Sequence, residues 1–395
     1  MEQTDISAPL SQRFTLQRNV LLSAIENREV SRAELARACG VSKQTMSEVF
    51  RELEEDGWLA VSGQTSGSVG RSAATYSVVP DRAILFGADI GGTKIHAAIA
   101  DINGEVLAEE EMPTTQNGRQ AIVDQISDAC LRLAEQADVA SGRVVSGAIG
   151  FPGAFNPQTR ALFMVPNIAG MEGFALADAL EARLGFPVRI DNDVNMAAKG
   201  EMWRGEGRDT PSFVFIALGT GIGMGIINDG RILTGARGAA GEISTLPIGG
   251  DPFDTRNFHA GTLETSVGSF AIRGRYEGAG GRPGLSVREI VDAAADGDAI
   301  AVATLTDVAR QIAVAIAAIS AVVDPQRIVL GGSIGARTEL LQRIRAVLPL
   351  CMTAPPECTV STLGPRAGLL GAISQSQDQF RDLLALQEPA RIGRN

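Results

Sequence analysis

The chain has 395 residues, 45% of them hydrophobic and 21% charged, so it is long enough for two or three domains with buried cores. Its net charge of −11 argues against indiscriminate nucleic-acid binding but leaves room for a small DNA-reading module. The first residues lack the apolar core of a signal peptide. Four scattered cysteines without a CxxC spacing indicate reduced, buried thiols in a cytoplasmic protein. They are Cys39, Cys130, Cys351 and Cys358.

Residues 1–80 predict three short helices followed by a two-stranded wing. Ser31 and Glu34 form a capping-box pair at the start of the second helix, and Gly40 can close that helix in the left-handed conformation. After a short turn, Ser42 caps a third helix. An apolar stripe at helical spacing in this third helix consists of Met46, Val49, Phe50 and Leu53. The pattern is that of a helix-turn-helix with a recognition helix.

The first residues of the recognition helix are expected to face base edges. Strands expected at 58–62 and 74–78 flank a wing whose tip is placed to reach a minor groove. Because residues 1–80 hold eight basic and ten acidic side chains, phosphate contacts must come from a local basic cluster. A helical protein-interaction cap is the alternative, but the cap-turn-cap spacing and the wing favour DNA binding. The candidate DNA-binding residues are Arg32, Lys43, Gln44, Thr45, Ser47, Arg51, Gly70 and Arg71.

After Pro80 and Asp81 the pattern changes to apolar strands and glycine turns. A buried strand at 83–89 ends in Asp89, and a second strand returns at 95–100. The turn between them contains Gly91, Gly92, Thr93 and Lys94. Its backbone N–H groups can bind phosphate oxygens, and the carboxylate of Asp89 can hold a hydrated Mg²⁺. A glycine pair between strands is a weak signal alone, because β-hairpins use the same residues.

The same arrangement occurs a second time. A strand at 212–218 runs into a turn that contains Gly219, Thr220 and Gly221, and a second strand returns to Ile227. Two similar halves with facing glycine turns can clasp one nucleotide between two lobes. The repeat is therefore more specific than either turn taken singly.

Polar residues follow a short apolar strand that begins at Val188. Asn192 offers a donor and an acceptor, and the carboxylate of Asp193 could take a proton from a sugar hydroxyl. Asp193 also stands where an N-cap would precede a helix at 194–202, so capping is an equally good interpretation of this stretch alone. Gly153 and Asn167 also fall at strand ends or in adjacent loops, as a ligand cleft would require.

Ordered motifs along the chain resemble those of the ROK family (repressor, open reading frame, kinase). They are Asp89–Lys94, Gly150–Gly153, Pro166–Asn167, Asn192–Asn195, Gly219–Gly223, Gly241–Glu242, Gly261–Glu264 and Gly331–Gly332. The resemblance implies a two-lobed, actin-like fold, and the N-terminal module resembles that of the repressor branch. It also implies a sugar surrounded by Asn167, Asn192, Asp193, Glu242 and Glu264, with Asp193 as catalytic base. The two glycine turns would face ATP phosphates, and Gly331 and Gly332 would face the adenosine.

The chain departs from the family at its structural zinc site. Thr245 stands at the position of the family's histidine ligand, and Thr255, Asn257 and Thr262 stand where three cysteines would be. Because these side chains are poor zinc ligands, we predict that the protein holds no zinc or other metal. His259 is interpreted as a loop histidine. We also expect Phe253 and Phe258 to fill the metal's volume, and Thr245 to alter ligand preference away from the usual glucose or N-acetylhexosamine.

The sequence thus predicts an α/β protein with an N-terminal winged helix-turn-helix, 1–80, and a two-lobed actin-like domain, 81–395. One lobe comprises about 81–192 plus the C-terminal helix, and the other about 193–370. The apolar stretch Ala299–Val323 contains Asp307 and Arg310, so it is interpreted as a buried helix whose ends could contribute to a dimer interface.

Two functions fit this architecture. The first is a repressor of carbohydrate metabolism, a homodimer or homotetramer on operator DNA, whose kinase-like domain senses a sugar or polyol. The alternative is an active ATP-dependent sugar kinase with Asp193 as base, for which ATP and Mg²⁺ would be required. The appended DNA module and the missing zinc ligands favour the repressor. A pure scaffold protein would explain neither the glycine turns nor the carboxylates.

Overall fold

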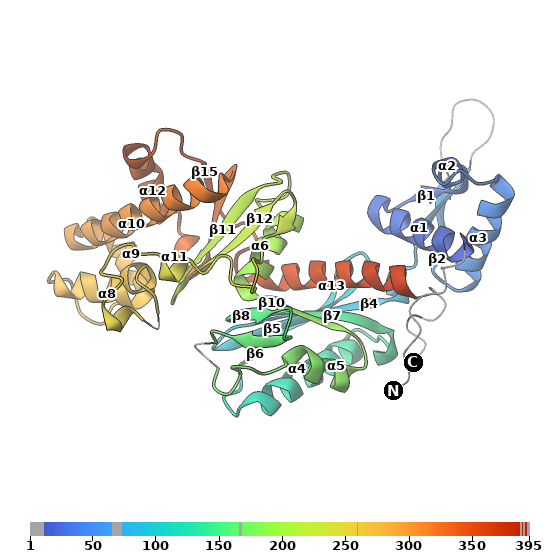
Figure 1. Cartoon of the computed structure of the whole chain (residues 1–395), viewed down its shortest axis with the longest axis horizontal. Coiled ribbons are helices and arrows are strands. Elements are labelled where there is room, and N and C mark those ends of the chain that lie inside the picture. Colours follow the sequence, from blue (N-terminus) through green and yellow to red (C-terminus); the bar gives the residue numbers. More distant parts are fainter. Residues whose placement is uncertain are drawn as a thin grey trace.

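A computed structural model describes residues 12–64, 73–165, 168–258, 260–387, 389 and 392. An N-terminal module and two lobes follow one another in an elongated arrangement (Figure 1). The long helix α13 (Ala367–Leu386) starts near the junction of the lobes, lies along one face of the first lobe and ends beside the module (Figure 1). The structure confirms the predicted combination of a winged helix with a two-lobed α/β domain.

The module is a winged helix-turn-helix. Its elements are α1 (Gln12–Asn27), β1 (Val30–Ser31), α2 (Arg32–Ala38), α3 (Lys43–Glu55), β2 (Leu59–Gln64) and β3 (Ala74–Val78), with the sheet order β1-β3-β2. Both predicted caps are present: the hydroxyl of Ser31 accepts a hydrogen bond from the N–H of Glu34, and that of Ser42 from the N–H of Thr45. The predicted apolar stripe of α3 is fully buried. Gly70 and Arg71 lie outside the described residues.

The first lobe, lobe 1, is a five-stranded sheet with helices on both faces. Its elements are β4 (Ile84–Ile90), β5 (Lys94–Asp101), β6 (Val106–Pro113), α4 (Arg119–Gln136), β7 (Val144–Phe151), β8 (Ala154–Asn156), β9 (Ala161–Phe163), α5 (Leu176–Leu184) and β10 (Val188–Asn192). The strand order is β10-β7-β4-β5-β6. Strands β10, β7 and β4 pair in parallel, whereas β5 is antiparallel to both of its neighbours, β4 and β6. Helices α4 and α5 cover one face, while α13 packs on β4 and β7 from the other.

The second lobe, lobe 2, repeats this sheet. Its elements are α6 (Asp193–Arg204), β11 (Phe213–Leu218), β12 (Ile222–Asn228), β13 (Arg231–Ile232), α7 (Glu264–Val267), α8 (Ser269–Gly278), α9 (Val287–Ala295), α10 (Ala299–Val323), β14 (Arg327–Gly331), α11 (Gly332–Gly335), α12 (Thr338–Cys351) and β15 (Glu357–Val360). The strand order β13-β12-β11-β14-β15 again joins an antiparallel hairpin to two parallel strands. The repeat expected from the two glycine turns is therefore a repeat of whole sheets.

Helix α10 is long and apolar enough to cross a membrane by length and composition, and it alone passes that test among the described residues. In the fold one of its faces is buried. Leu305, Val308, Ile312 and Ile316 pack into the core of lobe 2, against α8, α9 and α12. The prediction of a buried helix therefore holds for this face, whereas Val314 and Val322 are exposed.

The cysteines differ from the expectation in one respect. All four are free thiols, and Cys130 and Cys358 are buried as predicted. Cys351, however, is exposed because it is the last residue of α12, and Cys39 is half-buried at the end of α2.

Candidate functional site

A cavity of about 960 Å³ opens between the two lobes. Its walls come from the turn after β7, the start of α6, the β11–β12 turn and the loop that precedes α7. It brings together nine of the residues that the sequence predicted for ligand or nucleotide binding. They are Gly153, Asn192, Asp193, Gly219, Thr220, Gly221, Glu242, Glu264 and Gly332.

Asn192 is fixed at the end of β10 by three hydrogen bonds. Its Oδ1 accepts from the N–H groups of Val194 (2.8 Å) and Asn195 (3.2 Å), and its Nδ2 donates to the carbonyl of Gly153 (2.9 Å). Asn192, and not Asp193, is therefore the N-cap of α6. The sequence interpretation was one residue off, because the backbone of Asn192 is still extended (ψ 142°) whereas Asp193 already belongs to the helix.

Carboxylates dominate the polar lining of the cavity. Burial raises the pKa of Asp193 to about 6, and it also raises the pKa values of Glu242 and Glu264. Glu242 is raised further by the neighbouring charges of Asp193 and Glu264. A fourth carboxylate, Glu172, also lines the cavity. The sequence analysis missed it, because it lies in a loop between β9 and α5 with no motif around it.

The charge of the cavity restricts what it can hold. None of its described lining residues is Lys, Arg or His. A carboxylate accepts hydrogen bonds from hydroxyl groups strongly, whereas it repels a phosphate or another carboxylate. The lining therefore suits an uncharged polyhydroxylated ligand.

Two glycines of the cavity are required by close approach. A Cβ atom on Gly221 would lie 2.2 Å from Oε2 of Glu264, the oxygen that accepts a hydrogen bond from the N–H of Ile222 (3.0 Å). Gly332 has a φ of +78°, and its Cβ would lie 2.4 Å from the carbonyl of Leu218. Glycine at these positions therefore lets the backbone pack closely against Glu264 and against the backbone of Leu218.

The first glycine turn does not line the cavity. Of the predicted nucleotide-binding residues, Asp89, Gly91, Gly92, Thr93, Lys94 and Gly331 are absent from its walls. Lys94 forms an ion pair with Glu111 (2.5 Å). Asp89 lies next to Gly150. A Cβ atom on Gly150 would be 3.1 Å from Oδ1 of Asp89 and 3.4 Å from Cα of Asp193. The cavity between the lobes is therefore lined by the second glycine turn and not by the first.

The raised pKa values of Asp89 and Asp193 predict how the stability of the protein depends on pH. Burial and the nearby Asp193 raise the pKa of Asp89 to about 8, and the pKa of Asp193 is about 6. Between about pH 4 and pH 8 the folded chain therefore binds more protons than the unfolded chain, so the free energy of unfolding should fall as the pH rises through this window. We expect Asp89→Asn to flatten this dependence and to stabilise the protein by roughly 2 kcal/mol at pH 8.5.

Thermal unfolding of both proteins across this pH range, followed by circular dichroism, would measure the difference. Equal slopes for the wild type and the variant would show that Asp89 is ionised in the folded protein at neutral pH.

The residues at the family's zinc position do not fit a zinc ion. Asn257 donates through Nδ2 to the carbonyl of Asp251 (2.8 Å) and accepts through Oδ1 from Thr265 (2.8 Å), and Thr262 is buried. No group of three or more His, Cys, Asp or Glu side chains that could hold a metal occurs among the described residues, and His259 lies outside them. The absence of zinc stays a prediction.

The expectation about the aromatic residues of this loop was wrong, whereas the effect of Thr245 on ligand preference stays a prediction. Phe253 and Phe258 are 91% and 83% exposed, so they do not fill the metal's volume. Hydrogen bonds of Asn257 tie the loop instead. Thr245 is exposed, and its hydroxyl donates to the carbonyl of Glu242 (2.9 Å), whereas its neighbour Ser244 lines the cavity. Asn167 lies outside the described residues.

The start of α3 presents the predicted DNA-reading side chains. Lys43, Gln44 and Thr45 are exposed on its first turn, and Ser47 is half-buried. Arg51 is also exposed and contacts Glu55 at 3.7 Å. These residues form one polar face opposite the buried stripe.

Arg32 differs from the other predicted DNA contacts. Its guanidinium forms an ion pair with Glu54 (3.0 Å) and lies 4.7 Å from the centre of the Tyr76 ring. It therefore has partners within the module, and its contact with DNA stays a prediction.

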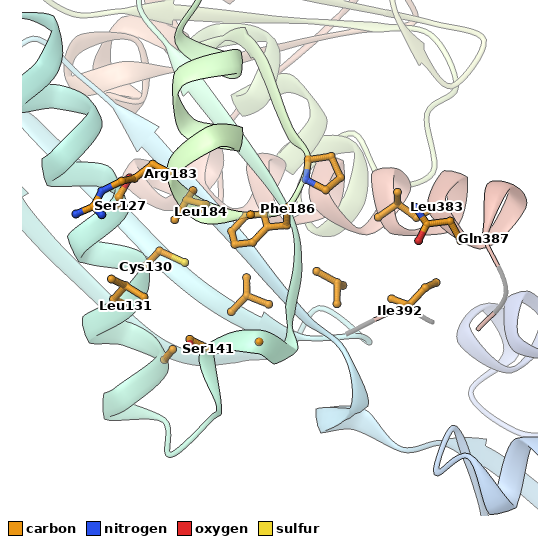
Figure 2. Close-up of a pocket in the computed structure, with 16 residues that line it drawn as sticks. Ser127, Cys130, Leu131, Ser141, Arg183, Leu184, Phe186, Leu383, Gln387 and Ile392 are labelled. Atoms are coloured by element: carbon orange, nitrogen blue, oxygen red, sulfur yellow. The ribbon is translucent and has the colours of Figure 1, made fainter. Parts of the chain in front are cut away.

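A second cavity, of about 400 Å³, lies at the opposite end of lobe 1 (Figure 2). Cys130 and Leu131 of α4, Phe186 before β10 and Leu383 of α13 line it. No carboxylate side chain occurs among its described lining residues, so it lacks the strong anionic acceptors that line the cavity between the lobes.

Comparison with known proteins identifies families for both parts of the chain. Residues 85–379 match the family model described as ROK family, and residues 15–72 match that of the MarR family. The chain is 32% identical over 307 residues to the glucokinase of Halalkalibacterium halodurans, which covers 72% of this chain and 92% of the glucokinase. It is 24% identical over 392 residues to the xylose repressor of Caldicellulosiruptor bescii, which covers 94% of this chain and 96% of the repressor.

A solved structure has a similar fold over both modules. It is a ROK-family transcriptional regulator described as a homologue of the E. coli MLC protein, with a TM-score of 0.77 and 23% identity over 96% of this chain and 98% of that one. The fold and the cleft thus define a sugar-kinase-like protein that carries a winged helix. The chain belongs to the ROK family, as its motifs predicted.

Proposed function

We propose that the protein is a transcriptional repressor whose winged helix binds operator DNA and whose cleft binds a sugar or related polyol. Binding in the cleft changes the affinity for the operator. The observation that carries the proposal is the presence, in one chain, of an exposed recognition helix and a carboxylate-lined cavity. The alignment with the xylose repressor covers 94% of the chain, whereas that with the glucokinase covers 72%, which also supports a regulator.

The effector is an uncharged sugar or polyol. Asn192, Asp193, Glu242 and Glu264 supply the hydrogen-bonding groups, and Glu172 adds a further acceptor at the rim. Glucose and xylose are the first compounds to test, because relatives of this chain bear the names glucokinase and xylose repressor. Sugar phosphates and sugar acids would bring a negative charge next to several carboxylates.

The repressor works as a homodimer or homotetramer in the cytoplasm. Residues 1–80 carry a slight excess of acidic side chains, so one copy of the module binds DNA weakly, and two linked copies gain effective concentration. The C-terminal end of α10 is a candidate contact between copies, because Val322 is 87% exposed there. Sedimentation equilibrium would test the oligomeric state.

Sugar phosphorylation is the second candidate function, favoured by Asp193 and by the glycine turn at Gly219–Gly221 in one cavity. Phosphoryl transfer would also need ATP and Mg²⁺ near Asp89 and Lys94. Neither of these residues lines the cavity, and Lys94 is paired with Glu111. Release of ADP from ATP and Mg²⁺ in the presence of glucose or xylose would establish this activity.

The main proposal is tested by measuring, with fluorescence anisotropy, how tightly the protein binds DNA from the region upstream of its own gene. We expect at least one of glucose, xylose and N-acetylglucosamine to change the dissociation constant tenfold or more, which corresponds to about 1.4 kcal/mol of coupling. Glucose 6-phosphate and gluconate serve as anionic controls and should change it little. Failure to bind this DNA with or without sugar would reject the repressor.

A further inference from the structure

We propose that α6 and α13 together transmit the state of the cleft to the DNA-binding module through two interdomain junctions. The arginine junction consists of Arg28, Glu105 and Arg204. The tryptophan junction consists of Trp58, Phe380 and Pro389. The inference rests on the proposed repressor function and specifies how its site is regulated.

Helix α6 runs from the cleft to the arginine junction. Its first turn carries Asp193 and is capped by Asn192, both of which line the cavity. Its last residue, Arg204, donates through Nη2 to Glu105 (2.7 Å) and to the carbonyl of Gly104 (3.1 Å) in the β5–β6 turn. A displacement of the helix N-terminus by a ligand would therefore also move the contact at its other end.

The module holds the same turn from its other side. Arg28, in the turn between α1 and β1, contacts Glu105 at 3.6 Å and donates to the carbonyl of Asn103 (3.4 Å). The β5–β6 turn is itself rigid, because the carboxylate of Asp101 accepts hydrogen bonds from the N–H groups of Asn103 and Glu105 (2.9 Å each). Glu105 thus joins an arginine of the module to an arginine at the end of the cleft helix.

Helix α13 makes the second connection. Its first turn lies against Asp89, since a Cβ atom on Gly368 would be 2.4 Å from Oδ2 of that residue. Near its other end, Phe380 stacks on Trp58 of the module, with ring centres 6.0 Å apart and both side chains fully buried. Nε1 of Trp58 also donates to the carbonyl of Pro389 (3.2 Å). The end of α13 is seen beside Ile392 in Figure 2.

The two helices move as one body, because their backbones touch. A Cβ atom on Gly371 of α13 would lie 1.7 Å from the carbonyl of Met196 in α6, and one on Gly200 of α6 would lie 2.1 Å from the carbonyl of Ala367 in α13. An ion pair of 2.5 Å between Lys199 and Asp378 adds to this contact. Packing this close leaves little freedom for one helix to shift alone, so both junctions respond together.

The chain carries a natural probe at each junction. Its two tryptophans are Trp58, in the tryptophan junction, and Trp203, which precedes Arg204 and packs over Gly104. The guanidinium of Arg204 lies 4.0 Å from the Trp203 ring. Incorporation of 5-fluorotryptophan into the full-length protein gives two ¹⁹F resonances, which Trp58→Phe and Trp203→Phe assign.

The experiment adds upstream duplex DNA to the labelled protein, because coupling is reciprocal and DNA must then affect the cleft helix. We expect the Trp203 resonance to shift on DNA binding, and this shift to be lost in Glu105→Gln. Asp292→Asn is the matched control: Asp292 is 54% exposed and paired with Arg337, against 58% for Glu105, and it lies in α9 of lobe 2. The control should keep the shift.

The outcomes separate the two proposals. DNA binding with an unmoved Trp203 resonance, or with an equal shift in Glu105→Gln, overturns the transmission through the arginine junction and leaves the repressor function standing. Absence of DNA binding overturns the repressor function itself. Because Glu105 is an exposed turn residue, Glu105→Gln should fold normally and change the DNA affinity by no more than about threefold.

Discussion

Lys43→Glu is expected to weaken operator binding by about 100-fold. Lys43 is exposed on the first turn of α3, where a recognition helix meets base edges and phosphates. Loss of one such contact costs about 1–3 kcal/mol, and a dimer loses it twice. Fluorescence anisotropy at fixed salt, with DNA from the upstream region, would measure the change.

Arg231→Glu provides the control for Lys43→Glu. It changes the net charge equally, but Arg231 is an exposed residue of β13 in lobe 2. If both variants weakened DNA binding to the same extent, overall charge and not the recognition helix would govern the affinity.

Asn192→Ala is expected to weaken effector binding by about 100-fold, because the amide lines the cavity and fixed hydrogen bonds to a ligand contribute about 1–3 kcal/mol. The same change removes the cap of α6 and the bond to Gly153, so the melting temperature should fall by a few degrees. Isothermal titration calorimetry with the sugar that shifts DNA binding would measure the affinity.

Asn192→Asp separates the two roles of this residue. The carboxylate keeps the acceptor that caps α6 but loses the amide donor. We expect it to retain the melting temperature of the wild type better than Asn192→Ala does and still to lose effector affinity. Wild-type affinity in Asn192→Asp would mean that the Asn192 amide does not donate to the ligand.

Local patterns were sufficient for much of the fold. The caps at Ser31 and Ser42 and the bounds of β3 and α10 depend on hydrogen bonds and periodicity within a few residues, so they could be read from the sequence. The repeated strand-turn-strand pattern likewise predicted two similar sheets. Asn192 and Asp193 are both suitable N-cap residues, so the sequence placed the N-cap of α6 one residue too late, at Asp193 instead of Asn192.

The candidate site was predicted less completely, because a site combines segments that are distant in sequence. Glu172 joins the cavity only through the fold of its loop, and no periodicity marks it. Phe253 and Phe258 are apolar and were placed inside, but the loop is held by polar contacts and leaves both rings exposed. The contacts of Arg32 with Glu54 and Tyr76 are likewise produced by folding and could not be read from the sequence.

The sequence by itself determined the class of the protein: a winged helix ahead of two glycine-turn sheets, with polar residues at the end of the strand beginning at Val188. Those features are local in the chain, so residue order specifies them. Only the tertiary structure decided which carboxylates share a cavity and that Lys94 pairs with Glu111 outside it. It alone also placed Glu105 between Arg28 and Arg204, because such contacts depend on how separate elements pack.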